Sequence, residues 1–577
     1  MRQHKQKVVK QGRLKDDDGN FVDTQQRAET LALYLERVQW AVRPCSVLEN
    51  MPQIGPTLDV MTGQISADEL EKAIRKLASN KAMGPDRIPA ELWKVIVQSK
   101  GVMESMLSFC NECWLQKVMP EQWHESIVAL LFKKGDVAMC ENYRPISLQC
   151  VIYKAFASIL LKRLKLGGAE EQIWKTLFGF KSRCGTREAL FVTRQVIENI
   201  FESKNGHGIF LALDWAKAFD SISVEGLLVS LQRFGVPAPF VAMVKGIYSN
   251  RCFKVRDSGH TSSTHPQHFG IIQGCPLSPF LFSILMTVLI YDAKSKFLQE
   301  RPGHTSHWML DEILYADDTM LIGKDVETLQ TYMDCIRECG RTYGLSLNAG
   351  KLESLFFNCD GELFNETGER IPHKQNLKYL GAILSADGRC TSEVARRVGA
   401  AKSEFDLLKQ CWQHACLSTG RKAKLYDSLV LSKLLYGLES VALSTNDARR
   451  VNGFHAACCR KMLRISSAYV SRVSNSYVLQ QVGSQPLTTM LLNRQLKFFG
   501  SLARRHNDDP AGSLLFQPDT VNVVQQACRR QGRPRKSWKQ EMSKHAHVMA
   551  GTEPLCSIIQ NEATWKRAVD KYCLQIG

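Results

Sequence analysis

Two adjacent aspartates between apolar runs are the feature that most constrains this chain. Glu312–Gly323 contains two runs typical of β-strands, separated by Ala316, Asp317 and Asp318, and this pattern predicts a hairpin with acids at its tip. Neighbouring carboxylates repel, and placing them beside an apolar strand end is costly unless a cation compensates. Mg²⁺ accepts such oxygen ligands. An exposed Asp-Asp turn is the alternative, because Asp is a common turn former.

A third acid follows another apolar run upstream. The segment Ile209–Ile222 predicts a buried strand that ends at Asp214. A helix is expected from about Ser223, with Val224 and Leu227 on its apolar face and Gly235 at its end. This geometry places Asp214 at an exposed strand end, where a carboxylate can meet a metal. A capping or turn aspartate remains an equal alternative for this segment alone.

A glycine-containing loop lies between these acids. Within Gly270–Phe282, Ser278 is expected to cap a helix that has Pro279 in its first position. Gln273 and Gly274 then fall in the loop just before the helix, where a glycine lets the backbone approach a ligand closely. The order of the three segments, with roughly a hundred residues between the first and last acid, makes coincidence a poor explanation.

Together these motifs resemble those of reverse transcriptases, most closely the LINE-type (non-LTR) retrotransposon class. Tyr-Ala-Asp-Asp in the hairpin is similar to the family signature, and Q-G-x-x-x-S-P is similar to its loop at the templating base and incoming nucleotide. The resemblance spans roughly residues 66–540. Further matching segments are Asn80–Ala90, Phe132–Asp136, Asn142–Leu148, Tyr153–Lys154, Gly179–Thr186, Gly344–Asn348 with Lys351, Tyr379–Gly381, Leu435–Gly437, Cys459–Arg464 and Gly532–Trp538.

The resemblance implies an α/β (α+β) right-hand polymerase with fingers, an antiparallel-sheet palm and a helical thumb, followed by a basic C-terminal extension. The expected parts are a linker or remnant over 1–60, an N-terminal extension of the fingers over 61–115, fingers and palm over 116–385, a thumb over 386–480 and a basic region over 481–577. Two departures from the family pattern are Leu352, where a Thr usually follows the Lys, and Met83, where a second Pro is common.

The implied reaction is RNA-directed DNA synthesis with dNTPs, an RNA template and a DNA primer. Asp214, Asp317 and Asp318 would hold two Mg²⁺ ions, with Mn²⁺ as an alternative. Acidic Asp220 is expected to be structural, because the family uses the first aspartate of its segment.

Residues expected to contact the nucleotide follow from the same resemblance. Phe219 would be the steric gate against a 2′-hydroxyl, with a core aromatic as the alternative. The expected dNTP-binding set is Phe219, Gln273, Gly274, Arg144, Lys154 and Lys351. For Arg144 and Lys154, gripping the triphosphate and contacting the template backbone are equal alternatives, and Lys351 would assist the leaving group.

The overall charge favours a polyanionic partner. The chain has 75 Lys and Arg against 57 Asp and Glu, a net charge of +18. The basic part of the C-terminal region carries Phe498, Phe499 and Trp538, which predicts stacking on single-stranded nucleic acid, with a solvated basic surface as the alternative. Its cations are Arg494, Lys497, Arg504, Arg505, Arg529, Arg530, Arg533, Arg535 and Lys536.

The sequence carries no signal peptide and no apolar run of the roughly 20 residues that a membrane span needs. We therefore expect an intracellular protein, nuclear or cytoplasmic or both, without a membrane partner. Its 19 cysteines follow no disulfide spacing. The pair Cys110 and Cys113 lies in a helix-like run without the two further ligands of a structural zinc, and is expected to be buried.

Neither a nuclease nor an RNase H pattern is recognisable in these residues. We expect the chain to be part of a longer polyprotein, or of an element ribonucleoprotein, that starts after a nuclease. Two rival functions remain: a group II intron-like reverse transcriptase with maturase activity, and a polymerase-derived RNA-binding protein without catalysis. The intact aspartates argue against the second.

Overall fold

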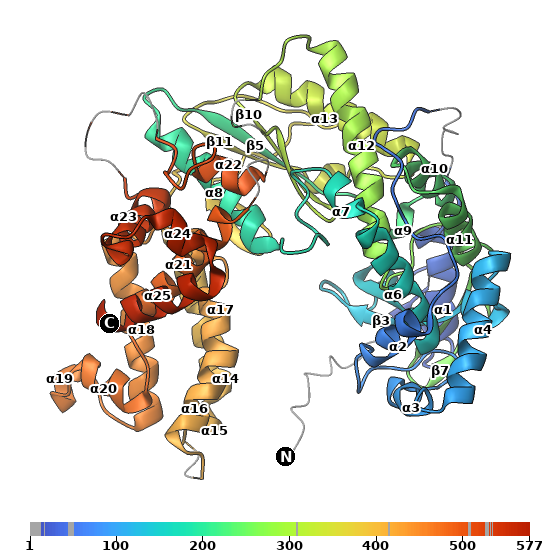
Figure 1. The fold of residues 1–577 in the computed structure, drawn as a ribbon, viewed down its shortest axis with the longest axis horizontal. Helices are drawn as coiled ribbons and strands as arrows, with labels where there is room; N and C mark the ends of the chain where they lie inside the picture. The colour runs from blue at the N-terminus through green and yellow to red at the C-terminus, as the bar shows by residue number, and fades with distance from the viewer. Residues whose placement is uncertain are drawn as a thin grey trace. The chain divides into compact units, whose positions relative to one another are not determined.

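Helices and strands alternate through a chain that packs into two compact units (Figure 1). The computed structural model describes residues 13–16, 18–43, 51–306, 308, 310–413, 416–505, 509–525, 530, 532 and 535–576. Unit 1 comprises residues 1–182, 215–302 and 331–348, and unit 2 comprises residues 183–214, 303–330 and 349–577. The expected mixture of α and β structure is confirmed.

Unit 1 is built from many helices and one main sheet. Its helices are α1 (Arg27–Tyr34), a π-helix η1 (Leu35–Gln39), α2 (Ala67–Arg75), α3 (Ala90–Ile96), α4 (Lys100–Gln116), α5 (Glu121–His124), η2 (Cys140–Asn142), α6 (Val151–Leu166), α7 (Ala169–Gln172), α9 (Ala218–Ser221), α10 (Val224–Arg233), α11 (Ala238–Tyr248) and α12 (Ser278–Glu300). Its strands are β1 (Leu14–Lys15), β2 (Phe21–Val22), β3 (Glu125–Phe132), β4 (Tyr143–Leu148), β6 (Cys252–Asp257), β7 (His260–Thr261) and β8 (His265–Pro266).

The main sheet of unit 1 has the order β4-β3-β6-β7, with β8 also paired to β6. Strand β3 runs antiparallel to β4 and parallel to β6. The N-terminal α1–η1 segment packs on this sheet, and the Trp40 ring meets the Phe253 ring edge-on at 4.7 Å. Residues expected to form a linker therefore contribute to the core of unit 1.

Capping explains where several helices of unit 1 begin. Ser66 forms a capping box with Glu69 at the start of α2, which buries Leu70 and Ile74 as expected. Ser223 caps α10 by accepting a hydrogen bond from the Gly226 N–H. The predicted capping role of Ser278 is wrong: Ser278 is the first residue of α12, and its buried hydroxyl pairs with the Tyr248 hydroxyl at 2.8 Å.

Unit 2 combines a small sheet with a long run of helices. Its strands are β5 (Gly208–Leu213), β9 (Glu312–Tyr315), β10 (Asp318–Gly323), β11 (Glu353–Phe357), β12 (Asn376–Tyr379) and β13 (Ala382–Ser385). Its helices are α8 (Thr186–Glu202), η3 (Ala349–Lys351), α14 (Thr391–Leu407), α15 (Lys409–Gln413), α16 (Thr419–Tyr426), η4 (Asp427–Leu431), α17 (Ser432–Leu435), η5 (Leu438–Ser440), α18 (Thr445–Leu463), α19 (Ala468–Ser471), α20 (Asn475–Val482), α21 (Leu487–Ala503), α22 (Pro510–Leu515), α23 (Trp538–Ala550), α24 (Leu555–Gln560) and α25 (Glu562–Ile576). Helix α13 (Val326–Thr342) continues from unit 2 into unit 1.

The sheet that carries the aspartates is antiparallel, in the order β11-β5-β10-β9. The hairpin predicted from the sequence is present as β9 and β10, with Tyr315 opposite Asp318. Strand β5 lies between β10 and β11 and buries Ile209, Phe210 and Leu211, which explains its continuous apolar run.

The helices of α14–α21 enclose a second apolar core, which includes Phe405, Trp412, Tyr426 and Leu434. The described residues between 391 and 482 are mainly helical. Four further helices of the described residues, α22–α25, follow α21 in the C-terminal region. Burial of Trp565 and Phe499 between them shows that this region packs as a folded unit rather than as a tail.

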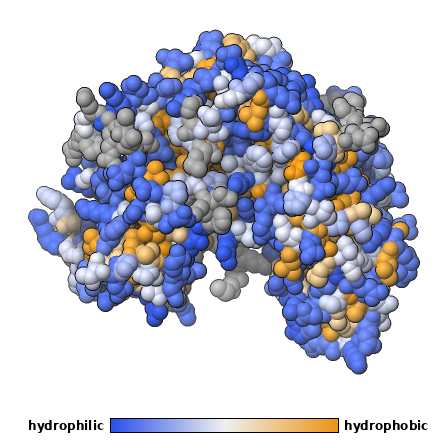
Figure 2. Space-filling view, turned by 45° about the horizontal axis from the view of Figure 1, so that its top comes forward, coloured by the Kyte–Doolittle hydropathy of each residue, from blue (hydrophilic) through white to orange (hydrophobic). Residues whose placement is uncertain are grey.

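On the face shown in Figure 2, hydrophilic residues predominate and hydrophobic residues form scattered patches. None of the described helices is long and apolar enough to cross a lipid bilayer. No disulfide joins the cysteines of the described residues. Cys110 and Cys113 are buried in α4, as predicted, and burial raises their thiol pKa values to about 12 and about 11.

Candidate functional site

The three aspartates singled out in the sequence lie where strands β5 and β10 of the unit 2 sheet meet their loops. This end of the strands is the carboxylate edge of the sheet. Strand β5 ends at Leu213, which pairs with Thr319 of β10, so that Asp214 and Asp318 lie on neighbouring strands just beyond that pair. Antiparallel neighbours place such residues within about 5 Å at their Cα atoms. Ala316 has a φ of 56°, and this left-handed residue turns the chain so that Asp317 lies at the tip.

The environment of Asp318 disfavours its ionised form. The pKa of Asp318 is raised to about 6, first by partial loss of hydration and then by the negative charges of Asp317 and Asp214. A bound cation would reverse both repulsive contributions, because it favours the ionised carboxylate. The edge is therefore an electrostatically unfavourable arrangement that a divalent cation would relieve.

Lys351 is the first cation at this edge. Its Nζ lies 2.9 Å from the Asp214 carboxylate, with 60% of the lysine side chain and 38% of the aspartate side chain exposed. An ion pair this open to water contributes little stability, about 0–1 kcal/mol. The Lys351 side chain can therefore leave Asp214 at small cost.

The donors at this edge fit a hard divalent cation. All three are carboxylates, the ligand type that Mg²⁺ prefers, and Mg²⁺ typically keeps waters and substrate phosphates in the rest of its coordination shell. Within the residues that the structure describes, no three His, Cys, Asp or Glu side chains form a ready-made metal cluster. The donor set accordingly suits an ion that arrives with its own water and substrate ligands.

In unit 1, the Gln273–Gly274 loop is fixed by backbone pairing with β4. The Ser147 N–H donates to the Gln273 carbonyl at 2.8 Å. Gly274 has a φ of 126°, and a Cβ added there would lie 2.5 Å from the Ser147 carbonyl oxygen. Only glycine fits here. The loop and the Arg144-Pro-Ile-Ser147 motif are therefore in direct backbone contact, which their separate positions in the sequence could not reveal.

Asp220 anchors the side chain of Gln273. Its carboxylate is 4% exposed and accepts hydrogen bonds from the Gln273 amide at 2.8 and 2.9 Å, the Gln39 amide at 2.8 Å and the Trp40 indole at 2.9 Å. Burial raises its pKa despite these donors. The structural role expected for Asp220 is confirmed. Gln39 and Trp40 were missed, although a polar-aromatic pair closing the first helix was a visible signal.

Phe219 lies beside Asp220 and is half-buried. Its ring stacks on Phe282 with centroids 4.7 Å apart and meets Phe180 edge-on at 6.3 Å. The Phe219 carbonyl accepts a hydrogen bond from the Ile271 N–H at 2.7 Å, which fixes the backbone of this residue against the glycine loop. Packing on one face and partial exposure are compatible both with a steric gate and with the alternative of a core aromatic.

The two basic candidates of unit 1 differ in environment. Arg144 is exposed on β4, whereas Lys154 on α6 is partly buried, and burial lowers its pKa. Lys154 is also within electrostatic range of Cys275, the residue after Gly274. The structure therefore brings Lys154 close to the glycine loop and leaves Arg144 on the surface of the strand that holds this loop.

The expected stacking surface in the C-terminal region is wrong for its aromatic residues. Phe498, Phe499 and Trp538 are fully buried, and the Trp538 indole donates to the Glu439 carbonyl at 2.7 Å. Much of the predicted basic surface is also paired internally: Lys497 with Asp570, Arg505 with Glu188 and Asp509, and Arg494 with Glu439. Arg529 and Arg533 lie outside the described residues.

Comparison with known proteins agrees with this geometry. Residues 132–384 match the family described as "Reverse transcriptase (RNA-dependent DNA polymerase)". The chain is 25% identical over 446 residues to the RNA-directed DNA polymerase from mobile element jockey of Drosophila melanogaster, covering 74% of this chain and 46% of that protein. It is 27% identical over 404 residues to a 149 kDa protein of transposon TX1 from Xenopus laevis, covering 65% and 28%. It is 24% identical over 425 residues to the Pol polyprotein of the R2 element from Popillia japonica, covering 69% and 55%.

Residues 132–384 thus form a reverse transcriptase domain, and all three aspartates fall within it. Most of the chain is similar to proteins named as an RNA-directed DNA polymerase and a Pol polyprotein of mobile elements, as the alignments with the jockey and R2 relatives show. The chain spans about half the length, or less, of the curated relatives that it matches. Members of this family depend on a divalent metal ion, in agreement with the chemistry of the carboxylate edge.

Proposed function

We propose that this chain extends a DNA primer on an RNA template, as the polymerase portion of a longer protein encoded by a retrotransposable element. The main supporting observation is the edge where Asp214, Asp317 and Asp318 converge, and where burial and then the charges of Asp317 and Asp214 raise the pKa of Asp318 to about 6. Without a bound cation, the folded state would be more stable if these three charges were farther apart.

The proposed parts of the polymerase follow the right-hand arrangement. Residues 61–115 extend the fingers, residues 116–385 form fingers and palm, residues 386–480 form the thumb, and a basic region follows over 481–577. Within residues 1–60, expected to be a linker or remnant, the α1–η1 segment packs on the main sheet of unit 1 and is proposed to belong with the fingers. The antiparallel sheet β11-β5-β10-β9 supports the palm assignment, and the helices α14–α20 support that of the thumb.

Asp214, Asp317 and Asp318 are proposed to hold two Mg²⁺ ions, with Mn²⁺ as an alternative. Bound there, the ions supply Lewis-acid stabilisation of the attacking 3′-hydroxyl and of the triphosphate charge. The chain itself contributes rigid placement: Asp214 and Asp318 are fixed by the β5–β10 pairing, so little reorganisation is needed when charge develops.

The residues proposed to contact the nucleotide are Phe219, Gln273, Gly274, Arg144, Lys154 and Lys351. Gln273 and Gly274 would orient the base and sugar, Phe219 would exclude a 2′-hydroxyl, and Lys154 with Arg144 would bind the triphosphate. Lys351, beside Asp214, would stabilise the leaving pyrophosphate. The anchoring of Gln273 by Asp220 supports this assignment, because a contact residue must be held in position to discriminate.

The proposed partners are an RNA template, a DNA primer and dNTPs, within an element ribonucleoprotein or polyprotein and without a membrane. The R2 relative is named as a Pol polyprotein, which supports a multi-part protein. The net charge of +18 supports the nucleic-acid partners.

Primer extension on poly(rA)/oligo(dT) with Mg²⁺ tests the proposal. Asp317→Ala is expected to lose incorporation by roughly 10³-fold or more, because one carboxylate contributes several kcal/mol to the barrier. The matched control is Asp360→Ala, which removes an exposed aspartate just beyond β11 and should incorporate like the wild type.

Equal incorporation by Asp317→Ala and the wild type would overturn the active-site assignment. No incorporation by any of the three proteins, with folding verified by circular dichroism, would favour the non-catalytic RNA-binding alternative.

A further inference from the structure

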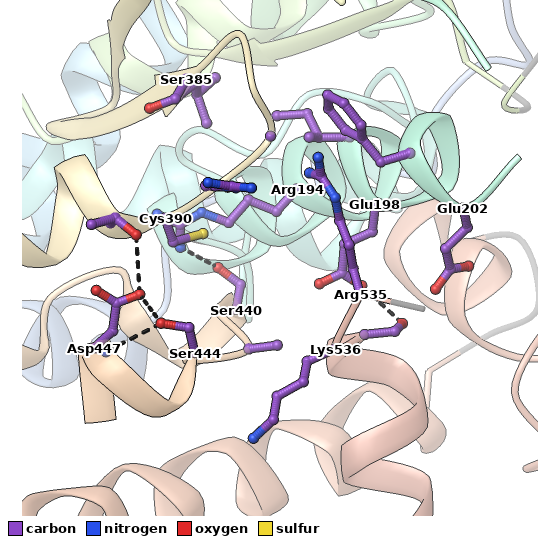
Figure 3. A pocket seen from close by; sticks show the side chains of 18 of the residues that line it. Arg194, Glu198, Glu202, Ser385, Cys390, Ser440, Ser444, Asp447, Arg535 and Lys536 are labelled. Atoms are coloured by element: carbon purple, nitrogen blue, oxygen red, sulfur yellow. Dashed lines mark hydrogen bonds between the residues drawn. The ribbon is translucent and has the colours of Figure 1, made fainter. Parts of the chain in front are cut away.

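A cavity of about 460 Å³ lies within unit 2, and none of the three aspartates is among its described lining residues (Figure 3). Four chain segments line it: the C-terminal half of α8, the turn from β13 into α14, the η5–α18 connection and the segment that leads into α23. Its volume is in the range of small-ligand sites, about 300–1,000 Å³. Residues 535–537 of the Gly532–Trp538 motif, which the polymerase function leaves without a role, contribute to its wall.

The ionisable side chains that line this cavity are mostly cationic. Among the described lining residues, the cations are Arg194, Arg389, Arg530, Arg535 and Lys536, and the acids are Glu198, Glu202 and Asp447.

Two of these acids accept hydrogen bonds, and the third, Glu202, forms an ion pair although neither of its carboxylate oxygens has a hydrogen-bond partner among the described residues. Glu202 pairs with Lys539 at 2.9 Å, and Asp447 accepts from Ser444 at 2.6 Å and from Thr391 at 3.2 Å. Glu198 accepts from Ser537 and from the Trp538 N–H, and burial raises its pKa to about 7, so that at neutral pH it carries only part of a charge. The remaining charge of the cavity is therefore positive.

Arg194 provides the most specific sign of a ligand. It is 4% exposed and comes from α8, and its Nη1 donates to the Ser440 hydroxyl at 2.8 Å and to the Gly437 carbonyl. Its Nη2 is buried in the cavity wall and has no hydrogen-bond partner among the residues that the structure describes. A buried charged donor left unsatisfied is unfavourable, and an anionic ligand would satisfy it.

Two further observations point to an anion. Arg535 lies over the Phe201 ring at 4.1 Å, and its pKa is lowered by burial, by Arg389 and by Arg530, so that these guanidinium groups repel one another. Helix α14 begins beside them at Thr391, and the side chain of its N-cap residue, Cys390, makes no capping hydrogen bond within the described part of the chain. The N-terminus of a helix this long attracts an anion through its N–H groups and dipole.

We propose that this cavity binds a phosphate oxyanion, held by Arg194, Arg389, Arg535 and the N-terminus of α14. Planar guanidinium groups suit phosphate because they donate two parallel hydrogen bonds. The apolar part of the wall, formed by Ile197, Phe201 and Leu384, accommodates the sugar or base that carries the phosphate. The phosphate belongs either to a nucleic-acid strand or to a free nucleotide or pyrophosphate. Neither source requires the carboxylate edge, so the inference stands apart from the proposed catalysis.

Binding measured in EDTA, where polymerisation cannot proceed, tests this site in the full chain. The test variant is Arg389→Gln with Arg535→Gln, which spares Arg194 and its structural contacts. The matched control is Arg567→Gln, an exposed arginine on α25 outside the cavity, and thermal unfolding verifies that all proteins are folded. The two probes are a short fluorescent single-stranded RNA and inorganic pyrophosphate.

If the phosphate belongs to a nucleic-acid strand, the double variant is expected to bind RNA about tenfold more weakly. The slope of log K against log salt concentration should fall by the amount that corresponds to about one or two phosphate contacts. For a free anion, RNA binding is unchanged, and pyrophosphate raises the melting temperature of the wild type but not of the double variant. Either result supports the site. Double-variant RNA binding and pyrophosphate response equal to those of Arg567→Gln would overturn it.

Discussion

Asp214 and Asp220 are six residues apart in the chain and have opposite environments. Asp214 lies at the end of β5, partly exposed, beside the like charges of Asp317 and Asp318. Asp220 is 4% exposed and is enclosed by the donors of Gln39, Trp40 and Gln273. The first acid keeps its lone pairs accessible to an arriving cation, whereas the second uses them within the fold.

The difference teaches that an aspartate is defined by its partners and not by its spacing. A carboxylate beside other carboxylates is unfavourable until a cation binds, as a metal-dependent catalytic site requires. A buried carboxylate that accepts hydrogen bonds from neutral donors stabilises the fold. Four predictions examine this contrast, from the largest expected effect to the smallest.

Asp318→Asn should give the largest effect and should separate activity from stability. Primer extension is expected to fall by roughly 10³-fold, about 4 kcal/mol, because a neutral amide cannot replace an anionic ligand. The melting temperature should stay the same or rise, since the substitution removes repulsion from Asp317 and Asp214. A variant that unfolds, or one that retains a third or more of wild-type activity, would contradict the contrast.

Asp220→Ala should instead lose stability first. Removing the carboxylate leaves three buried donor groups without their acceptor, and we expect a loss of about 3 kcal/mol in the free energy of unfolding, measured by urea denaturation.

Below its new melting temperature, the Asp220→Ala protein should show a higher KM for dNTPs with a smaller change in kcat, because Gln273 loses its anchor. Asp360→Ala is the matched control. A loss confined to kcat, with an unchanged free energy of unfolding, would show that Asp220 acts in catalysis. Asp220 would then not differ in role from Asp214.

Glu69 extends the comparison to a carboxylate paired with a buried cation. Arg163 binds it through two hydrogen bonds of 2.8 Å, which, with the Ser66 N–H, hold the pKa of Glu69 at about 2. The folded-state pKa is depressed, so the stabilisation is present above the ordinary value of 4.5 and is lost as pH falls toward 2.

Glu69→Gln should therefore cost about 2 kcal/mol near pH 7 and have little effect near pH 2. Urea denaturation at several pH values measures this dependence, and Glu71→Gln, an exposed acid of the same helix, is the control. An equal loss at both pH values would show that packing, and not charge, is responsible.

Phe219→Val should give the smallest effect, and it examines the residue between the two aspartates. If the ring is the steric gate, incorporation of ribonucleotides relative to deoxyribonucleotides should rise about tenfold, or about 1.4 kcal/mol. If the ring is only a core aromatic packed on Phe282, the variant should lose stability with an unchanged ratio. Single-nucleotide extension with dTTP and UTP distinguishes the two.

Local features of the fold could be predicted where a short segment carries its own physical reason. The β9–β10 hairpin, the capping of α2 by Ser66 and the burial of Cys110 all follow from neighbouring residues. Predictions failed where a long-range partner decided. Ser278 binds Tyr248 instead of capping its helix, and Trp538 packs on Phe191 at 4.9 Å instead of stacking on bases.

The sequence by itself determined the identity of the three aspartates, their order and the strand ends on which they lie, because hydrophobic periodicity and turn residues act over a few positions. Only the tertiary structure decided which acids repel and which are satisfied, that Gln39 and Trp40 hold Asp220, and that the Gly532–Trp538 motif borders a cavity with Arg194. These outcomes depend on residues up to several hundred positions apart, and burial and Coulomb energy are properties of neighbours in space.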